Sequence, residues 1–266
     1  MKRAPEHLVF FLGGRDLEMA TIRDLLQEVA PGRFYDKALA WGAAASAYRQ
    51  EILATLAGGL TPVLVELADD LDLTPTRTIV VDHHGARAGA HQPTALHQVF
   101  ALLGLPGERW TRWFELVAAN DRGYIPAMIE RGATLEEIVR VRAADRAAQG
   151  ITPAEEAAGE QAVAQAETLA GGLLTVVHLP HARTATVTDR LQPELGGAGY
   201  HNLLVDCPAQ QNFFGAGQLV LALQQRFPGG WYGGALPARG FWGHDAPVPN
   251  VLPFLLDKLR AITGWS

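Results

Sequence analysis

Short apolar runs alternate with longer stretches of helical periodicity through the first half of the chain. Four apolar runs predict buried strands: HLVFFLG (7–13), RFYDKAL (33–39), PVLVEL (62–67) and RTIVVD (77–82). Segments between them that carry a helical period and end at glycine predict helices: MATIRDLLQEVAPG (19–32) and AAASAYRQEILATLAGG (43–59). Strands that alternate with helices in this way predict an α/β fold, with a parallel sheet flanked by helices.

Two more helices are predicted after the fourth strand. They are PTALHQVFALLG (93–104) and ERWTRWFELVAANDRGY (108–124), and the second ends on a turn signal around Asp121. Residues from about 132 to 171 are rich in Ala and Glu, which favours helices. We therefore predict a first domain over 1–131, followed by a helical linker over 132–171.

A smaller α/β domain is predicted over 172–266. Two segments of this region have the composition of strands: LLTVVHLPHARTATVTDRL (173–191) and YHNLLVDCP (200–208). Two others have the period of helices: QLVLALQQRF (218–227) and VLPFLLDKLRAITG (251–264). A glycine-rich stretch, GGWYGGALPARGFWGHD (229–245), separates the two helices.

Composition limits the class of protein. The 266 residues are 48% hydrophobic, enough for a sizeable core, and the single cysteine fits a reducing compartment, so a cytoplasmic location is expected. No apolar run approaches the roughly 20 residues of a membrane span, which predicts no membrane partner. The net charge is −6 and no basic block occurs, which disfavours broad electrostatic capture of nucleic acid.

Acidic residues collect where the predicted strands end. Asp16 and Glu18 follow the first strand, Glu66 ends the third, and the fourth runs into Asp82 and His83. In parallel sheets, ligand-binding groups gather beyond the carboxyl ends of the strands. Carboxylate oxygens together with imidazole suit Mn²⁺ or Mg²⁺ better than a metal that prefers thiolates. The pattern therefore predicts a divalent-cation site at this edge.

The order of these motifs resembles the DHH phosphoesterase superfamily. VVDHHG (80–85) matches the triplet of that family, Glu66 matches a strand-end aspartate, with Asp69 as a nearby alternative, and Asp121 in AANDRGY resembles the fourth motif. The family's first motif is a histidine followed at four and six residues by aspartates. The corresponding positions here are Leu12, Asp16 and Glu18.

The resemblance implies a pair of divalent cations, commonly manganese. One ion would be held by Glu18, Glu66, His83 and Asp121, and Glu66 would bridge to a second ion held by Asp16 and the family's histidine. Because Leu12 cannot coordinate a metal, the chain would hold one ion, or two if His91, His97 or His201 supplies the missing ligand, and a metal-free protein is the alternative. His84 would contact the substrate phosphate, and Asp82 would orient an imidazole.

The glycine-rich stretch loosely resembles the substrate-gripping segment of the family's smaller domain. Gly233 and Gly234 would let backbone N–H groups approach a phosphate, and Arg239 and His244 would contact it. The alternative interpretation is a tight turn with aromatic core residues.

The resemblance implies a metal-dependent phosphohydrolase that acts on a small phosphate ester, a short oligonucleotide or a cyclic dinucleotide. Two such ions could lower the pKa of a water molecule and neutralise charge on a phosphoryl group. Leu12 and the two glutamates leave an alternative, an inactive relative that binds a nucleotide or a partner protein. A manganese-dependent inorganic pyrophosphatase is a third possibility. The sequence does not indicate an oligomeric state.

Overall fold

The computed structural model describes residues 4–73, 77–83, 92–234, 236–245 and 248–264. The chain divides into two compact units, Met1–Gly150 and Ile151–Ser266. This division falls inside the segment predicted as a helical linker. Helix α5 (Leu135–Ala148) therefore belongs to the first unit and α6 (Pro153–Ala164) to the second.

The first unit contains a four-stranded parallel sheet, which confirms the predicted α/β class. The strands are β1 (Leu8–Leu12), β2 (Phe34–Asp36), β3 (Thr61–Val65) and β4 (Ile79–Val81), in the order β2-β1-β3-β4. Leu12 lies opposite Val65, and Val65 lies opposite Val81. The carboxyl ends of β1, β3 and β4 are therefore level, which brings the residues that follow them to one edge.

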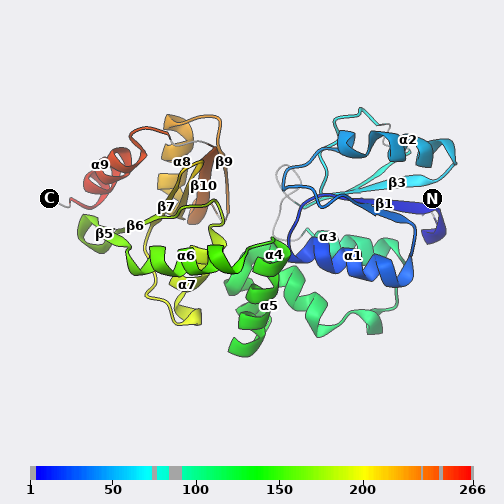
Figure 1. The fold of residues 1–266 in the computed structure, drawn as a ribbon, viewed down its shortest axis with the longest axis horizontal. Coiled ribbons are helices and arrows are strands. Elements are labelled where there is room, and N and C mark those ends of the chain that lie inside the picture. Colours follow the sequence, from blue (N-terminus) through cyan, green and yellow to red (C-terminus); the bar gives the residue numbers. More distant parts are fainter. Residues whose placement is uncertain (1–3, 74–76, 84–91, 235, 246–247, 265–266) are drawn as a thin grey trace. The chain divides into compact units, whose positions relative to one another are not determined.

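Helices cover both faces of this sheet (Figure 1). Helix α2 (Arg49–Ala57) packs on one face, where Val9 and Phe11 meet Ile52, and α1 (Leu17–Val29) and α3 (Ala95–Leu102) lie on the other. Every residue of β1 and of β3 is buried, because neither face of the sheet meets water. Helix α4 (Arg112–Glu130) and helix α5 pack on α1. Short 3₁₀ helices are η1 (Pro5–His7), η2 (Ala45–Tyr48) and η4 (Gly107–Arg109).

The second unit is built on a mixed sheet of six strands. They are β5 (Glu167–Leu169), β6 (Leu174–His178), β7 (Leu203–Cys207), β8 (Gln210–Ala216), β9 (Trp231–Gly233) and β10 (Arg239–Asp245), in the order β5-β6-β7-β8-β10-β9. Its helices, besides α6, are α7 (Ala185–Leu191), α8 (Gly217–Arg226) and α9 (Val251–Thr263), with 3₁₀ turns η5 (Ala170–Gly172) and η6 (Pro193–Leu195). Residues of α8 and α9 pack around the buried Trp242, and the opposite face packs on α6 and α7.

The prediction of strand for all of 173–191 is wrong in its second half. β6 ends at His178, and residues 185–191 form α7. Thr186 and Val187 have β-branched side chains, which favour strands. In the structure both belong to α7, and their side chains are buried by packing. Gly159 of α6 lets α7 approach closely, since a Cβ there would lie 2.5 Å from the Thr186 side chain. Packing between the two helices therefore outweighs local preference.

Among the helices that the structure describes, none is long and apolar enough to cross a membrane.

Candidate metal centre

Four side chains meet at the carboxyl edge of the first sheet. They are Glu18, Glu66, His83 and Asp121, and one ligand atom of each lies within 4.8 Å of all the others. His83 Nε2 lies 3.5 Å from Glu18 Oε2, 3.4 Å from Glu66 Oε1 and 2.5 Å from Asp121 Oδ2. All four side chains are largely buried. The structure thus brings together four of the five side chains that the sequence proposes as ligands.

Glu18 is placed by the N-termini of two helices. Helix α1 begins after Asp16, whose Oδ1 accepts a hydrogen bond from the Met19 backbone N–H at 2.8 Å, and Glu18 follows in the first turn. Glu18 Oε1 accepts a hydrogen bond at 3.0 Å from the backbone N–H of Leu96, in the first turn of α3. This contact leaves Oε2 directed toward His83.

Glu66 follows β3 with a left-handed backbone. Its φ is 51°, a conformation that costs a non-glycine residue roughly 1–3 kcal/mol. The Glu66 N–H donates to Val81 O at 2.8 Å, which extends the pairing of β3 with β4. Gly13 makes the close approach of the β1 end possible, because a Cβ there would lie 2.2 Å from Glu66 O. Gly13 was not among the predicted site residues, although a glycine at a strand end often marks such an approach.

Asp121 lies just before a kink in α4. The turn signal in AANDRGY predicted the end of a helix, and the helical backbone does break there before a second helical stretch continues to Glu130. Gly123 and Tyr124 have non-helical backbone angles, and Tyr124 has a φ of 61°. The predicted helix end is therefore confirmed as a break in α4, and a further helical stretch follows it.

The electrostatics of the cluster favour a cation. Burial, followed by repulsion from Asp121, raises the pKa of Glu18 to about 7. Burial, followed by repulsion from Asp121 and Glu66, raises the pKa of Asp16 well above its ordinary value. Burial opposes protonation of His83, but the nearby carboxylates of Asp121, Glu18 and Glu66 outweigh it and raise its pKa to about 12. A proton on Nε2 can be donated to one acceptor at a time, whereas three carboxylates surround it. Oxygen donors with one imidazole fit a hard divalent cation, which would displace that proton.

Glu18 is expected to contribute less to the stability of the metal-free protein as pH rises from about 4.5 to about 7. Folded Glu18 keeps its proton up to about pH 7, whereas the same carboxyl in an unfolded chain loses it near 4.5. Glu18 then binds more protons in the folded state, so its contribution to the free energy of unfolding falls as pH rises, whereas His97, whose pKa burial lowers to about 4, contributes in the opposite direction up to about pH 6.5. Urea denaturation of chelator-treated protein at several pH values would measure the slope. The wild-type protein should lose stability relative to Glu18→Gln across the window, and a difference that stays constant or rises would contradict the assignment.

The first-motif position does not supply a further ligand. The Leu12 side chain is buried, and its backbone carbonyl accepts a hydrogen bond from Tyr48 Oη at 2.7 Å. His97 Nδ1 lies 3.0 Å from Thr94 Oγ1, and its ring packs on Trp110. Within the described part of the chain, the cluster holds no second imidazole.

Some predicted residues remain untested by the geometry. Asp82 is half-buried, and its carbonyl accepts a hydrogen bond from Gln98 Nε2 at 3.2 Å, so its role in orienting an imidazole stays a prediction. His84 and His91 lie outside the described residues. His201 belongs to the second unit.

The predicted substrate-binding glycines lie in the β9–β10 hairpin. A Cβ on Gly233 would lie 2.9 Å from the Phe241 ring, and one on Gly234, whose φ is 104°, would lie 2.7 Å from the Gly240 Cα. Both glycines therefore allow close packing within the hairpin. Arg239 donates to His201 O at 3.3 Å, and His244 Nδ1 lies 2.6 Å from Asp245 O. A role for these residues in substrate binding stays a prediction.

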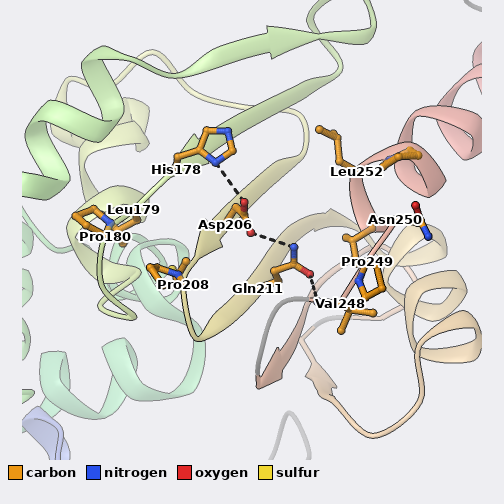
Figure 2. A pocket seen from close by; sticks show the side chains of 13 residues that line it. His178, Leu179, Pro180, Asp206, Pro208, Gln211, Val248, Pro249, Asn250 and Leu252 are labelled. Carbon is orange, nitrogen blue, oxygen red and sulfur yellow. Dashed lines mark hydrogen bonds and ion pairs between the residues drawn. The ribbon is translucent and has the colours of Figure 1, made fainter.

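A separate cavity of about 700 Å³ lies in the second unit, where β6 and β7 end near the start of α9 (Figure 2). Its polar side chains form a hydrogen-bonded series. His178 Nδ1 lies 3.2 Å from Asp206 Oδ2, Gln211 Nε2 donates to Asp206 Oδ1 at 3.0 Å, and the Val248 N–H donates to Gln211 Oε1 at 2.9 Å. Leucine, proline and valine side chains form much of the remaining wall. The buried Cys207 has a pKa raised to about 12 by burial and by Asp206, which makes it a poor nucleophile.

Comparisons with known proteins place this architecture among solved structures. The match to RecJ of Thermus thermophilus in complex with Mn²⁺ covers 97% of this chain and 52% of the RecJ chain, with a TM-score of 0.51 and 13% sequence identity. The DHH domain of a member of a family of ribosomal proteins matches 98% and 88%, with the same TM-score and identity. An exopolyphosphatase-related protein of Bacteroides fragilis matches 96% and 92%, again at 0.51 and 13%. No protein-family model and no curated protein sequence matches the chain.

The chain shares its fold with these structures, one of which is a DHH domain, and this confirms the fold that the resemblance drawn from VVDHHG and its flanking acids implied. At 13% identity, the likeness establishes the fold and not the reaction. The reaction therefore has to follow from the chemistry of the cluster itself.

Proposed function

We propose that the protein is a divalent-metal-dependent phosphoesterase that acts on a small phosphate ester, a short oligonucleotide or a cyclic dinucleotide. The observation that carries the proposal is the convergence of Glu18, Glu66 and Asp121 on His83 at the edge of a parallel sheet. The fold shared with RecJ, whose structure contains Mn²⁺, supports the same class of chemistry.

The four clustered side chains would hold the cation. Bound there, Mn²⁺ or Mg²⁺ would supply positive charge to a phosphoryl group and lower the pKa of water. The helix N-terminus at Leu96 fixes Glu18, and the turn at Glu66 fixes the second carboxylate, so that two ligand groups are already in position before binding. A local site of this kind also suits a protein of net charge −6, which has little general attraction for phosphate esters.

We propose one tightly held ion per chain. Leu12 removes a ligand from the second position, and Asp16 uses one oxygen to cap α1. Calorimetric titration of chelator-treated protein with Mn²⁺ should therefore give a stoichiometry near one. A stoichiometry of two would contradict a single site and would point to a ligand outside the described residues.

Turnover tests the function directly. The manganese-loaded protein should release product from a linear dinucleotide, a cyclic dinucleotide or a simple phosphodiester such as bis(p-nitrophenyl) phosphate, and chelator should abolish the release. Inorganic pyrophosphate belongs in the same assay, and cleavage of it alone would favour a pyrophosphatase.

An inactive relative is the second candidate, because Leu12 occupies the position of a family ligand. Tight Mn²⁺ binding without turnover of any of these substrates, but with binding of a nucleotide, would favour that candidate. Measurable turnover that depends on the metal would exclude it.

A further inference from the structure

A buried ion pair on α5 contacts the residues that directly precede Glu18 and Asp121 in the chain. Arg142 Nη1 lies 2.8 Å from Asp145 Oδ2, and the two side chains are 6% and 8% exposed. Taking two charges out of water is costly, and an apolar pair of similar size is often at least as stable. The stability of the helix alone therefore does not explain why a charged pair occupies this position.

Asp145 reaches the segment that carries Glu18. Its Oδ1 accepts a hydrogen bond at 3.1 Å from the backbone N–H of Leu17, the first residue of α1. Its Oδ2 accepts from Arg142 and, at 3.0 Å, from Gln149 Nε2. A carboxylate at a helix N-terminus satisfies an amide that has no partner within the helix. Asp145 therefore fixes the backbone one residue before Glu18.

Arg142 reaches the segment that carries Asp121. Its Nη1 also donates to Asn120 Oδ1 at 2.8 Å, and Asn120 is largely buried. The guanidinium carbon lies 4.4 Å from the centroid of the ring of Tyr124, one of the two residues that form the kink. Arg142 thus contacts residues on both sides of Asp121, where α4 departs from helical geometry.

We propose that Arg142 and Asp145 are a positioning pair, which holds the start of α1 and the kink of α4 at the separation that Glu18 and Asp121 need to share one cation. The proposal rests on the metal site of the proposed function. One rigid helix contacts both ligand-bearing segments through a single charged pair, so a change in the pair is transmitted to the distance between the two ligands. Partners that orient ligands typically contribute about 10- to 100-fold in metal affinity.

Asp145→Asn tests the proposal. Asparagine keeps an acceptor for the Leu17 N–H but loses the charge that holds Arg142, so the affinity for Mn²⁺ should fall about tenfold or more. The matched control is Arg112→Gln. Arg112 also joins α4 to α5, through Glu137 at 2.9 Å, but that pair is exposed. Calorimetric titration measures the affinity, and thermal denaturation of the metal-free proteins confirms that each variant is folded.

A purely structural role has a different signature. It would lower the melting temperature of Asp145→Asn but leave the Mn²⁺ affinity of the folded protein unchanged, and that result would overturn the proposal. If Asp145→Asn does not fold, the neutral double variant Arg142→Met with Asp145→Leu replaces it, because it leaves no unpaired buried charge. Weakened binding by this folded double variant would support the proposal, and wild-type affinity would overturn it.

The failure of the proposed function would look different again. Wild-type protein that binds no Mn²⁺ would remove the metal site, and the positioning pair with it. Wild-type protein that binds Mn²⁺ tightly, with variants that bind equally well, would remove the positioning pair alone.

Discussion

Replacing His83 with alanine is expected to abolish Mn²⁺ binding and metal-dependent turnover. His83 Nε2 is the common neighbour of the three clustered carboxylates, at 3.5, 3.4 and 2.5 Å. Alanine removes the one imidazole that the described residues bring to the cluster and leaves three acidic groups around the vacated position. Because loss of a partner that merely orients a ligand costs about 10- to 100-fold in metal affinity, loss of the ligand itself should exceed that range. Calorimetric titration of the chelator-treated variant measures it.

His178→Ala is the control for this result. His178 also pairs with a carboxylate, Asp206 at 3.2 Å, but it lies in the second unit and its side chain is 62% exposed. Its replacement should leave Mn²⁺ binding unchanged. Tight binding by a folded His83→Ala protein would show that His83 is not a ligand, and the cluster would have to be reinterpreted.

Gly13→Ala should destabilise the protein and weaken metal binding together. The new Cβ would lie 2.2 Å from Glu66 O and 2.7 Å from Val65 O, and both are backbone atoms that cannot rotate away. This clash is relieved only if the end of β1 moves away from the end of β3, and that movement displaces Glu66. Overpacking of this kind costs about 1–3 kcal/mol and sometimes more. Urea denaturation should show that loss, and titration with Mn²⁺ should show affinity reduced at least about tenfold, as for a misplaced ligand.

The neighbouring glycine offers a matched control. A Cβ on Gly14 would lie 3.1 Å from Cδ1 of Trp41, whose side chain is 64% exposed and can shift. Gly14→Ala should therefore change stability and metal affinity much less than Gly13→Ala. Equal effects of the two substitutions would show that any side chain added at residues 13–14 disturbs stability and metal affinity. The close approach of Gly13 to Glu66 would then not be the cause.

The approximate positions of the strands in the first unit and the edge that carries the acids could be predicted from the sequence. Apolar runs ended at polar residues, and parallel strands must present their carboxyl ends together. In the second unit the same rules assigned residues 185–191 to a strand, because Thr186 and Val187 have strand propensity while their partner, α6, is remote in sequence. The hydrophobic pattern predicted β1 and β3 correctly because both faces of their sheet are buried, which requires apolar residues. It failed for residues 185–191 because packing on α6 decides their conformation.

By itself, the sequence determined which chemical groups gather at the sheet edge, because strand ends and motif order are local properties of the chain. Only the tertiary structure decided how those groups are held. Glu18 is oriented by an amide 78 residues away, and the start of α1 is capped by a carboxylate 128 residues away. The left-handed backbone of Glu66 depends on space that Gly13 leaves on a different strand. Contacts over such separations follow from packing, which no local pattern of hydrophobic and polar residues encodes.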